Sequence, residues 1–252
     1  MPIPPRILLI FAHPDDESFV AAGLARHYVE RGAQLILVTA TRGDAGRVGD
    51  PPLCDRKVLP ELREAELRQA ADLIGISQVH LLDYQDKYLA DAPIDRIREE
   101  LVALIRRHRP HVVITFDPNG MNEHADHIAI SRFTMDAVAA SADPRWATES
   151  ARPHRVQRLL WTTPILPWEV TRSADLSLAP GVDFRVDITP YRDVKAKALR
   201  AHRSQHVPVN RCFLSKPDVD QILSIEVFRQ VWGPPLQRRP ADDVLAGIDL
   251  SV

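Results

Sequence analysis

The segment His-Pro-Asp-Asp-Glu-Ser at residues 13–18 places one imidazole and three carboxylates directly after the apolar run Ile-Leu-Leu-Ile-Phe-Ala. Acidic side chains at the start of a helix are ordinary, because they stabilise the helix N-terminus and Asp16 or Ser18 can cap it. That interpretation leaves His13 and the run of three acids unexplained, since adjacent carboxylates repel one another. A divalent cation bound by His13 and one aspartate would remove the repulsion.

A second stretch, Asn-Glu-His-Ala-Asp-His at residues 122–127, offers two further imidazoles. His124 and His127 are three residues apart, so on one helical turn they share a face. Two histidines with this spacing are more often solvent-exposed bystanders. The stretch is also not the HExxH motif of zinc proteases, because its glutamate precedes the first histidine. It is the conjunction with His13 and the neighbouring carboxylates that indicates a metal site.

Both stretches must be positioned by the surrounding elements, which alternate in type along the chain. Short β-rich runs alternate with longer helical periodicities, a pattern typical of βαβ units around a parallel sheet. Strands are predicted over residues 6–12, 34–41, 78–84, 111–116, 156–163 and 183–188, and helices over 18–32, 60–75, 93–109, 124–141 and 190–204. The portion from about residue 205 is rich in prolines and turns, and no internal repeat is present.

Polar and titratable residues follow four of the predicted strands. The stretches are HPDDES after the first strand, TRGDAGR after the second, DYQD at the end of the third and DPNGMNEHADH after the fourth. Ligands of open parallel sheets bind outside the carboxyl ends of the strands. We therefore expect a single domain over residues 1–252 of the α/β class. Its Rossmann-like, mostly parallel sheet is flanked by helices, with the active site at the carboxyl ends of the strands.

The composition argues against several other classes of protein. The 32 basic and 34 acidic residues nearly balance, so no field indicates binding to nucleic acid or to an anionic membrane. No apolar run approaches the roughly 18 residues of a membrane helix. Cys54 and Cys212 lie far apart without CxxC spacing, so we expect a cytoplasmic protein with free thiols. The glycines at 43, 46 and 49 do not form GxGxxG after the first strand, which disfavours a nicotinamide cofactor.

The two chemistry-bearing stretches together resemble the LmbE/PIG-L superfamily of metal-dependent de-N-acetylases. AHPDDES and DPNGMNEHADHIA are similar to the AHPDDE and HPDH boxes of that family, except that Ala125 stands where the family usually has proline. The segments LREAELRQAADLIG and HRSQ extend the resemblance, which covers roughly residues 6–205. It implies zinc-dependent removal of the N-acetyl group from an N-acetylglucosamine-type conjugate, such as those that precede mycothiol and bacillithiol.

The resemblance implies a role for each matching residue. The zinc ligands would be His13, Asp16 and His127. Water would complete an open site, and this donor set would also accept Fe²⁺ or Mn²⁺. Asp15 would be the general base. His124 would stabilise the oxyanion or act as the acid toward the leaving amine, and Asp126 would orient His124.

Six further residues are candidate substrate contacts. They are Arg47, Asp44, Arg63, Glu64, His202 and Gln205. Arg47 could pair with an anionic aglycone or a sugar hydroxyl, whereas Asp44 is equally well explained as a turn residue. Arg63 and Glu64 could be an ordinary surface pair. His202 and Gln205 could close the cleft, although a histidine in the last turn of a helix has a structural explanation. Trp168, in the loop PILPWEV, could stack on a sugar ring.

The function predicted from these residues is hydrolysis of the N-acetyl group of an amino-sugar conjugate. Hydrolysis of another small amide would use the same site. A metal-containing carbohydrate-binding protein without turnover is a third hypothesis. Asp15 and His124 disfavour that hypothesis, because binding alone requires neither a base nor an acid. The sequence contains no long heptad repeat, and a homo-oligomer is compatible with it.

Overall fold

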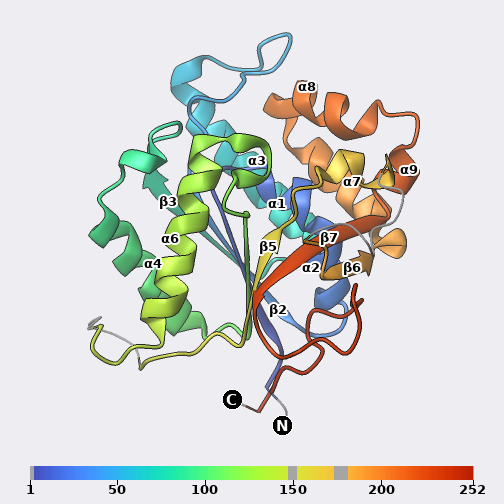
Figure 1. Cartoon of the computed structure of the whole chain (residues 1–252). Coiled ribbons are helices and arrows are strands. Elements are labelled where there is room, and N and C mark those ends of the chain that lie inside the picture. Colours follow the sequence, from blue (N-terminus) through green and yellow to red (C-terminus); the bar gives the residue numbers. More distant parts are fainter. Residues whose placement is uncertain (1–2, 147–151, 173–180, 252) are drawn as a thin grey trace.

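The computed structural model describes residues 3–146, 152–172 and 181–251, and these residues contain a seven-stranded sheet (Figure 1). The strands are β1 (Arg6–Phe11), β2 (Gln34–Thr41), β3 (Gln78–Tyr84), β4 (Val112–Thr115), β5 (Arg158–Thr162), β6 (Phe184–Asp187) and β7 (Ile225–Trp232). Their order across the sheet is β3-β2-β1-β4-β5-β7-β6. Strands β1 to β5 pair with one another in parallel, and β7 is antiparallel to both β5 and β6. The predicted α/β class with a mostly parallel sheet is confirmed.

Strand β1 lies in the middle of the parallel part, between β2 and β4. Ile7 pairs with Leu35 of β2 on one side and with Val112 of β4 on the other. Every side chain from Ile7 to Phe11 is fully buried. Because helices cover both faces of the sheet, this strand is a continuous apolar run without polar alternation.

Helices cover the two faces of the sheet (Figure 1). The α-helices of the described residues are α1 (Asp16–Val20), α2 (Ala22–Val29), α3 (Leu59–Ile74), α4 (Ile94–His108), α5 (Gly120–Glu123), α6 (Ala125–Ser141), α7 (Arg192–Ala201), α8 (His206–Val209) and α9 (Val219–Ile222). Helices α4 and α6 pack together on one face, and α2, α3 and α7 pack together on the other. Gly75 ends α3 with a left-handed φ of 92°, in agreement with the helix end predicted there.

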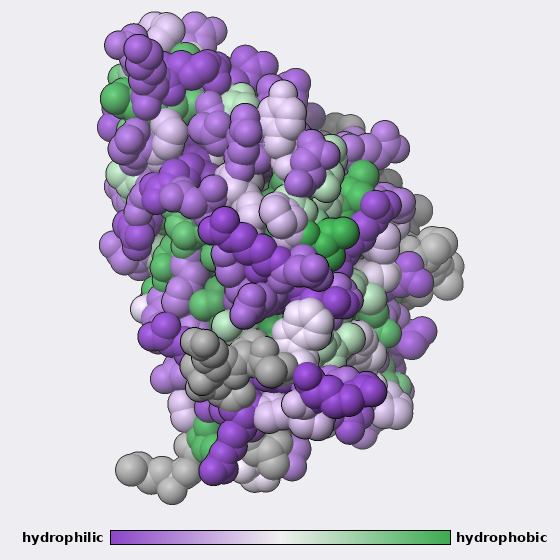
Figure 2. All heavy atoms as spheres, turned by 90° about the vertical axis from the view of Figure 1, so that its left-hand side faces the viewer, coloured by the Kyte–Doolittle hydropathy of each residue, from purple (hydrophilic) through white to green (hydrophobic). Residues whose placement is uncertain are grey.

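The outer surface on the α4 side of the molecule is mainly hydrophilic. Figure 2 shows this face, where hydrophobic residues are scattered among hydrophilic ones. Helix α4 illustrates the cause, because it buries Ile97, Leu101 and Ile105 along one stripe and exposes charged residues elsewhere. None of the described helices combines the length and the apolar character needed to cross a membrane.

Among the differences from the sequence-based prediction, two concern the layout of the sheet and its first helix. The helix expected over residues 18–32 is divided, because Ala21 leaves the helical region at φ −141° between α1 and α2. Strand β7 was not predicted, because it lies in the proline-rich portion after residue 205, although its β-branched and aromatic residues are typical of a strand. This strand pairs with both β5 and β6. The described strands beyond residue 145, β5, β6 and β7, therefore complete the same sheet.

The polar stretches that follow β1, β2, β3 and β4 meet at one edge of the sheet, the upper edge in Figure 1. They meet there because the four strands are parallel and adjacent. The backbone holds the starts of the first two stretches together, since the N–H of Thr41 donates to the carbonyl oxygen of Ala12, the residue before His13, at 2.9 Å.

Candidate metal centre and catalytic site

The turn after β1 fixes the carboxylate of Asp16. The backbone N–H groups of Ala12 and His13 donate to Asp16 Oδ2 at 3.1 and 2.8 Å. The residue is buried at the start of α1. Its second oxygen, Oδ1, is directed at His127, whose Nε2 lies 3.3 Å away.

His127 lies in the first turn of α6 with one ring nitrogen available for a ligand. Its ring stacks on Phe116, with 3.9 Å between the ring centroids, and its Nδ1 lies 3.1 Å from the carbonyl oxygen of Gly120. A carbonyl oxygen only accepts hydrogen bonds, so Nδ1 carries the proton and Nε2 presents its lone pair. That lone pair faces His13 Nδ1 at 3.2 Å.

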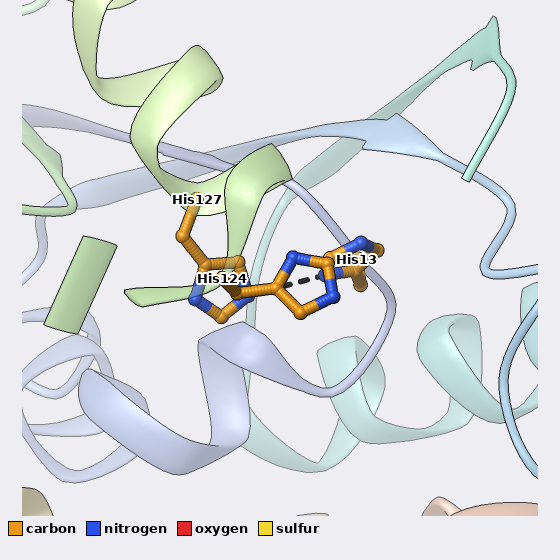
Figure 3. Close-up of side chains that lie close together, drawn as sticks. All are labelled: His13, His124 and His127. Carbon is orange, nitrogen blue, oxygen red and sulfur yellow. Dashed lines mark hydrogen bonds between the residues drawn. The ribbon is translucent and has the colours of Figure 1, made fainter. Parts of the chain in front are cut away.

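The three predicted metal ligands therefore converge. The separations are 3.2 Å between His13 Nδ1 and His127 Nε2, 3.3 Å between His127 Nε2 and Asp16 Oδ1, and 3.7 Å between His13 Nδ1 and Asp16 Oδ2. Ligand atoms bound at about 2.0–2.1 Å to a tetrahedral Zn²⁺ are about 3.3 Å apart. The pair His13 Nδ1 and His127 Nε2 and the pair His127 Nε2 and Asp16 Oδ1 are thus at separations that suit ligands of one tetrahedral ion, whereas the contact of Asp16 with His13 uses its other oxygen, Oδ2. Figure 3 shows the imidazoles of His13 and His127 facing each other with His124 beside them.

Two carboxylates hold the other nitrogen of His13. Its Nε2 lies 3.2 Å from Asp86 Oδ1 and 3.1 Å from Asp126 Oδ2. Asp126 is itself fixed, because the backbone N–H groups of Lys87 and Leu89 donate to its carboxylate at 2.6 and 3.2 Å. Ionised carboxylates only accept, so Nε2 carries the proton and Nδ1 faces the other ligands. Outer carboxylates of this kind orient a ligating imidazole and raise its basicity.

This arrangement corrects the role predicted for Asp126. Its carboxylate contacts His13 and not His124. The link to His124 is through the backbone, since the N–H of Asp126 donates to His124 Nδ1 at 3.2 Å. Sequence reasoning did not assign Asp86 a role. Its position in the polar stretch DYQD, at the carboxyl end of β3, was the signal that could have identified it.

The carboxylates of the site favour positive charge at His13. Burial acts to lower the pKa of His13, but hydrogen bonds to Asp126 and Asp86 outweigh burial and raise this pKa to about 10. Burial acts to raise the pKa of Asp16, and the neighbouring His127 and His13 outweigh it and hold this pKa below its usual value. Three carboxylates thus surround one imidazole, and a metal ion would balance their charge.

His124 lies beside the ligands but is held in a different way. One of its ring nitrogens is within 4.8 Å of ring nitrogens of His13 and His127. Its Nδ1 accepts the N–H of Asp126 at the N-terminus of α6, so in the neutral ring Nε2 carries the proton. Burial lowers the pKa of His124, and the charges of His13 and His127 lower it further. The ring is therefore neutral at neutral pH.

Asp15 lies between the two metal-ligand candidates of this turn and has a positive φ of 114°. Its Oδ2 lies 3.1 Å from Arg63 Nη2. Arg63 is buried, and it also donates to the carbonyl oxygens of Pro14 and Gly43. Residue 43 must be glycine for this contact, because a Cβ there would lie 2.0 Å from the guanidinium. Burial raises the pKa of Asp15 to about 6, although Arg63 opposes the shift.

Arg47 and Gln205, two of the predicted substrate contacts, are joined at the rim. Gln205 Nε2 donates to the carbonyl oxygen of Arg47 at 2.7 Å, and the N–H of Arg47 lies 3.3 Å from Gln205 Oε1. The Arg47 side chain is exposed. Asp44 lies in the turn after β2, and its Oδ1 accepts the backbone N–H of Asp86 at 3.2 Å.

Two other predicted contacts lie away from the cleft. Glu64 pairs with Arg42 and with Arg68, as expected of the surface alternative. His202 is fully buried, and its Nε2 lies 2.8 Å from Glu17 Oε1. A side chain with no exposed surface cannot touch a substrate, so the predicted contact through His202 is wrong.

A cleft of about 240 Å³ opens onto the metal-ligand candidates, Asp15 and His124. Gln205 and the buried Arg63 line it as well. The apolar part of its wall consists of Phe19, Met121, Trp168 and Pro208. The rings of Phe19 and Trp168 meet edge to face with 6.2 Å between their centroids. The cleft thus joins a polar reaction centre to an aromatic wall, a combination suited to a sugar.

Comparisons with known sequences agree with this site. The family model described as "PIG-L: GlcNAc-PI de-N-acetylase" matches residues 8–138. A 1D-myo-inositol 2-acetamido-2-deoxy-alpha-D-glucopyranoside deacetylase from Thermobifida fusca (strain YX) is 33% identical to this chain and aligns with 93% of it and 96% of its own length. The enzyme of the same name from Mycolicibacterium smegmatis is 32% identical, with 98% of each chain aligned.

Solved structures agree with the fold. A conserved protein from Thermus thermophilus superposes with a TM-score of 0.70 at 26% identity, covering 91% of this chain and 96% of its own. The N,N'-diacetylchitobiose deacetylase from Pyrococcus horikoshii also gives a TM-score of 0.70, at 22% identity, covering 90% of this chain and 83% of its own. This chain belongs to the PIG-L family of de-N-acetylases. The family resemblance inferred from the two sequence boxes is confirmed.

Proposed function

We propose that this protein is a zinc-dependent N-deacetylase that hydrolyses the acetamide of an N-acetylglucosamine conjugate. The observation that carries the proposal is the convergence of His13, Asp16 and His127 beside Asp15 in one cleft. Family membership supports the deacetylase class, and the names of the related enzymes from Thermobifida fusca and Mycolicibacterium smegmatis support GlcNAc-inositol as a substrate.

The metal would be held by His13, Asp16 and His127. A divalent ion bound there would supply Lewis-acid activation of water and of the amide carbonyl. Two imidazoles and one carboxylate suit Zn²⁺, and the same set also accepts Fe²⁺ or Mn²⁺. Three protein ligands are typical of catalytic zinc sites, whereas structural sites usually have four.

Asp15 would act as the general base and take a proton from the attacking water. A base is most effective when its pKa lies near the working pH. Burial raises the pKa of Asp15 to about 6, which meets that condition. The ion pair with Arg63 holds the carboxylate in place over the cleft.

His124 would stabilise the negative charge that develops on the amide oxygen. Its Nδ1 is occupied by the N–H of Asp126, so the neutral ring presents Nε2–H as a donor. A donor aimed at an oxyanion is worth about a hundredfold or more in rate. This arrangement favours the oxyanion role over the role of a proton-donating imidazolium, because the pKa of His124 is lowered.

The rim residues would bind the conjugate. Trp168 and Phe19 offer aromatic surface to a sugar ring, and Arg47 and Gln205 are joined to each other at the rim. Arg63 and Asp44 would act by supporting this rim. We expect hydroxyl groups of the substrate to contact the polar side of the cleft.

The test is release of primary amine by the metal-loaded protein from free GlcNAc, GlcNAc-inositol, GlcNAc-malate and N,N'-diacetylchitobiose. Asp15→Asn serves as the matched blank, because it keeps the size of the side chain and the metal ligands. We expect release from at least one conjugate, with roughly 100-fold or greater loss in the blank. Absence of release from all four, with one equivalent of metal bound, would refute the proposed function.

A further inference from the structure

Asp15 has a backbone conformation that most residues avoid. Its φ of 114° and ψ of −28° lie in the left-handed half of the map, where a side chain is strained unless its surroundings hold it. The carboxylate of Glu17 holds the backbone at this point, since Glu17 Oε2 accepts the N–H of Asp15 at 3.1 Å. Arg63 holds the other end of the residue, the Asp15 carboxylate.

Glu17 is in turn fixed by two donors. Its Oε1 lies 2.8 Å from His202 Nε2 and 2.5 Å from Ser18 Oγ. The glutamate is 1% exposed. A carboxylate buried to this extent depends on its hydrogen-bond donors, because it has lost those of water. The geometry at Asp15 therefore depends on groups that lie behind the turn and outside the cleft.

The main donor comes from a remote part of the chain. His202 follows the last residue of α7, and its ring is fully buried. Its Nδ1 has no hydrogen-bond partner among the residues that the structure describes. Leaving a polar nitrogen unpaired is unfavourable, so packing alone gives no reason for an imidazole here. The contact of Nε2 with Glu17 explains why an imidazole is present.

Neither residue takes part directly in the proposed chemistry. Glu17 and His202 are absent from the lining of the catalytic cleft. Their side chains reach the proposed base through the hydrogen bond that the Asp15 N–H donates to Glu17.

We propose that Glu17 and His202 are positioning residues that hold the general base: His202 fixes Glu17, and Glu17 fixes the strained backbone of Asp15. The proposal rests on the proposed function, because it assumes that Asp15 takes the proton from water. Displacement of a reacting group by about 1 Å typically costs about 100-fold in rate. Loss of the donor behind Glu17 is a direct way to cause such a displacement.

The test compares three variants of the full chain. His202→Leu removes the donor to Glu17, whereas His202→Gln retains an N–H that can occupy the place of Nε2. Arg158→Met is the control for loss of a buried charged group. Arg158 is fully buried at the start of β5 and donates to Gln230 and to the carbonyl oxygen of Ala246, at the end of the sheet away from the cleft.

Three quantities decide the outcome: bound metal, kcat and KM for the preferred conjugate, and the hydrogen-exchange rate of the Asp15 amide measured by NMR. We expect His202→Leu to keep one equivalent of metal and to lower kcat by roughly 10- to 100-fold, with KM changed much less. The Asp15 amide should exchange roughly tenfold faster or more. His202→Gln should stay near the wild type in all three quantities, and Arg158→Met should keep kcat despite a lower Tm.

Unchanged amide exchange and unchanged kcat in His202→Leu would overturn the proposal. Equal losses of kcat in His202→Leu and Arg158→Met would also overturn it, because general loosening would then suffice. The exchange measurement needs no substrate. Failure of the wild type to release amine would therefore refute the proposed function, while the exchange rate of Asp15 still decides whether Glu17 and His202 hold this turn.

Discussion

The substitution Asp126→Asn separates two roles for this residue. The structure assigns its carboxylate to His13, whereas the family resemblance led us to expect that it orients His124. If the carboxylate supports His13, the variant should lose metal affinity. At saturating metal it should keep most of its kcat.

The magnitude follows from the contacts of Asp126. Its Oδ2 accepts from His13 and Lys87, and its Oδ1 accepts from Leu89. An asparagine oxygen can serve the first two donors, but its NH₂ would then face the N–H of Leu89. One buried N–H left unpaired should lower the free energy of unfolding by about 1–3 kcal/mol. Loss of the outer-shell charge should weaken metal binding about 10- to 100-fold.

The assay is competition for Zn²⁺ against a chelator of known affinity, followed by kcat at saturating Zn²⁺. Asp86→Asn is the matched control, because Asp86 is the second carboxylate on His13 Nε2. Both variants should weaken metal binding in the same direction. Wild-type metal affinity together with a large loss of kcat in Asp126→Asn would refute the reasoning and restore the His124 role.

Three further outcomes are expected. His127→Ala should lower bound metal well below one equivalent, whereas His124→Ala should keep the metal and lose turnover by about 100-fold. Burial lowers the pKa of His154 to about 4. As the pH falls from 6.5, the unfolded chain therefore binds a proton that the folded chain does not, and the free energy of unfolding decreases. In urea unfolding at pH 5, His154→Gln should remove roughly 2 kcal/mol of this decrease. Lys195→Met should cost about 3–5 kcal/mol in denaturant unfolding, because it leaves the buried Glu226 without its ion-pair partner.

Each of these outcomes has a clear opposite. A full equivalent of metal in His127→Ala, or none in His124→Ala, would exchange the roles of the two imidazoles. Parallel pH profiles for the wild type and His154→Gln would mean that this ring does not titrate differently on folding. A loss below about 1 kcal/mol in Lys195→Met would show that Glu226 keeps adequate partners in the backbone N–H groups of Gly23 and Leu24.

Local patterns predicted the parallel half of the sheet well. The apolar run before His13 and the glycine at 75 lie where the sequence placed them, and the helix predicted over 124–141 spans Ala125–Ser141, because burial and turn chemistry act within a few residues. Strand β7 was not predicted, because its position is set by distant parts of the chain. Its place depends on pairing with β5 and β6, and nothing in its flanking prolines indicates those partners.

In the site, too, contacts set by local sequence were predicted and contacts between distant side chains were not. The convergence of His13, Asp16 and His127 follows from parallel strands that end at one edge, so the sequence was sufficient to predict it. The orientation of Asp126 and the burial of His202 depend on which side chains meet across more than a hundred residues of chain. Spacing within a motif cannot distinguish a carboxylate that serves one imidazole from one that serves its neighbour.

The position of β7 gives the molecule an order of assembly. The strands β1 to β4 and the segments with His13, Asp16 and His127 leave the ribosome first and can pair at once. β5 then has one open edge, and β6 has no neighbour, until Ile225–Trp232 is synthesised and inserts between them. During that interval the nascent chain exposes unpaired strand edges, which are sites of aggregation. Chaperone demand during synthesis, and sensitivity to truncation before residue 225, should therefore concentrate in the last part of the chain, although the chemistry is encoded in the first.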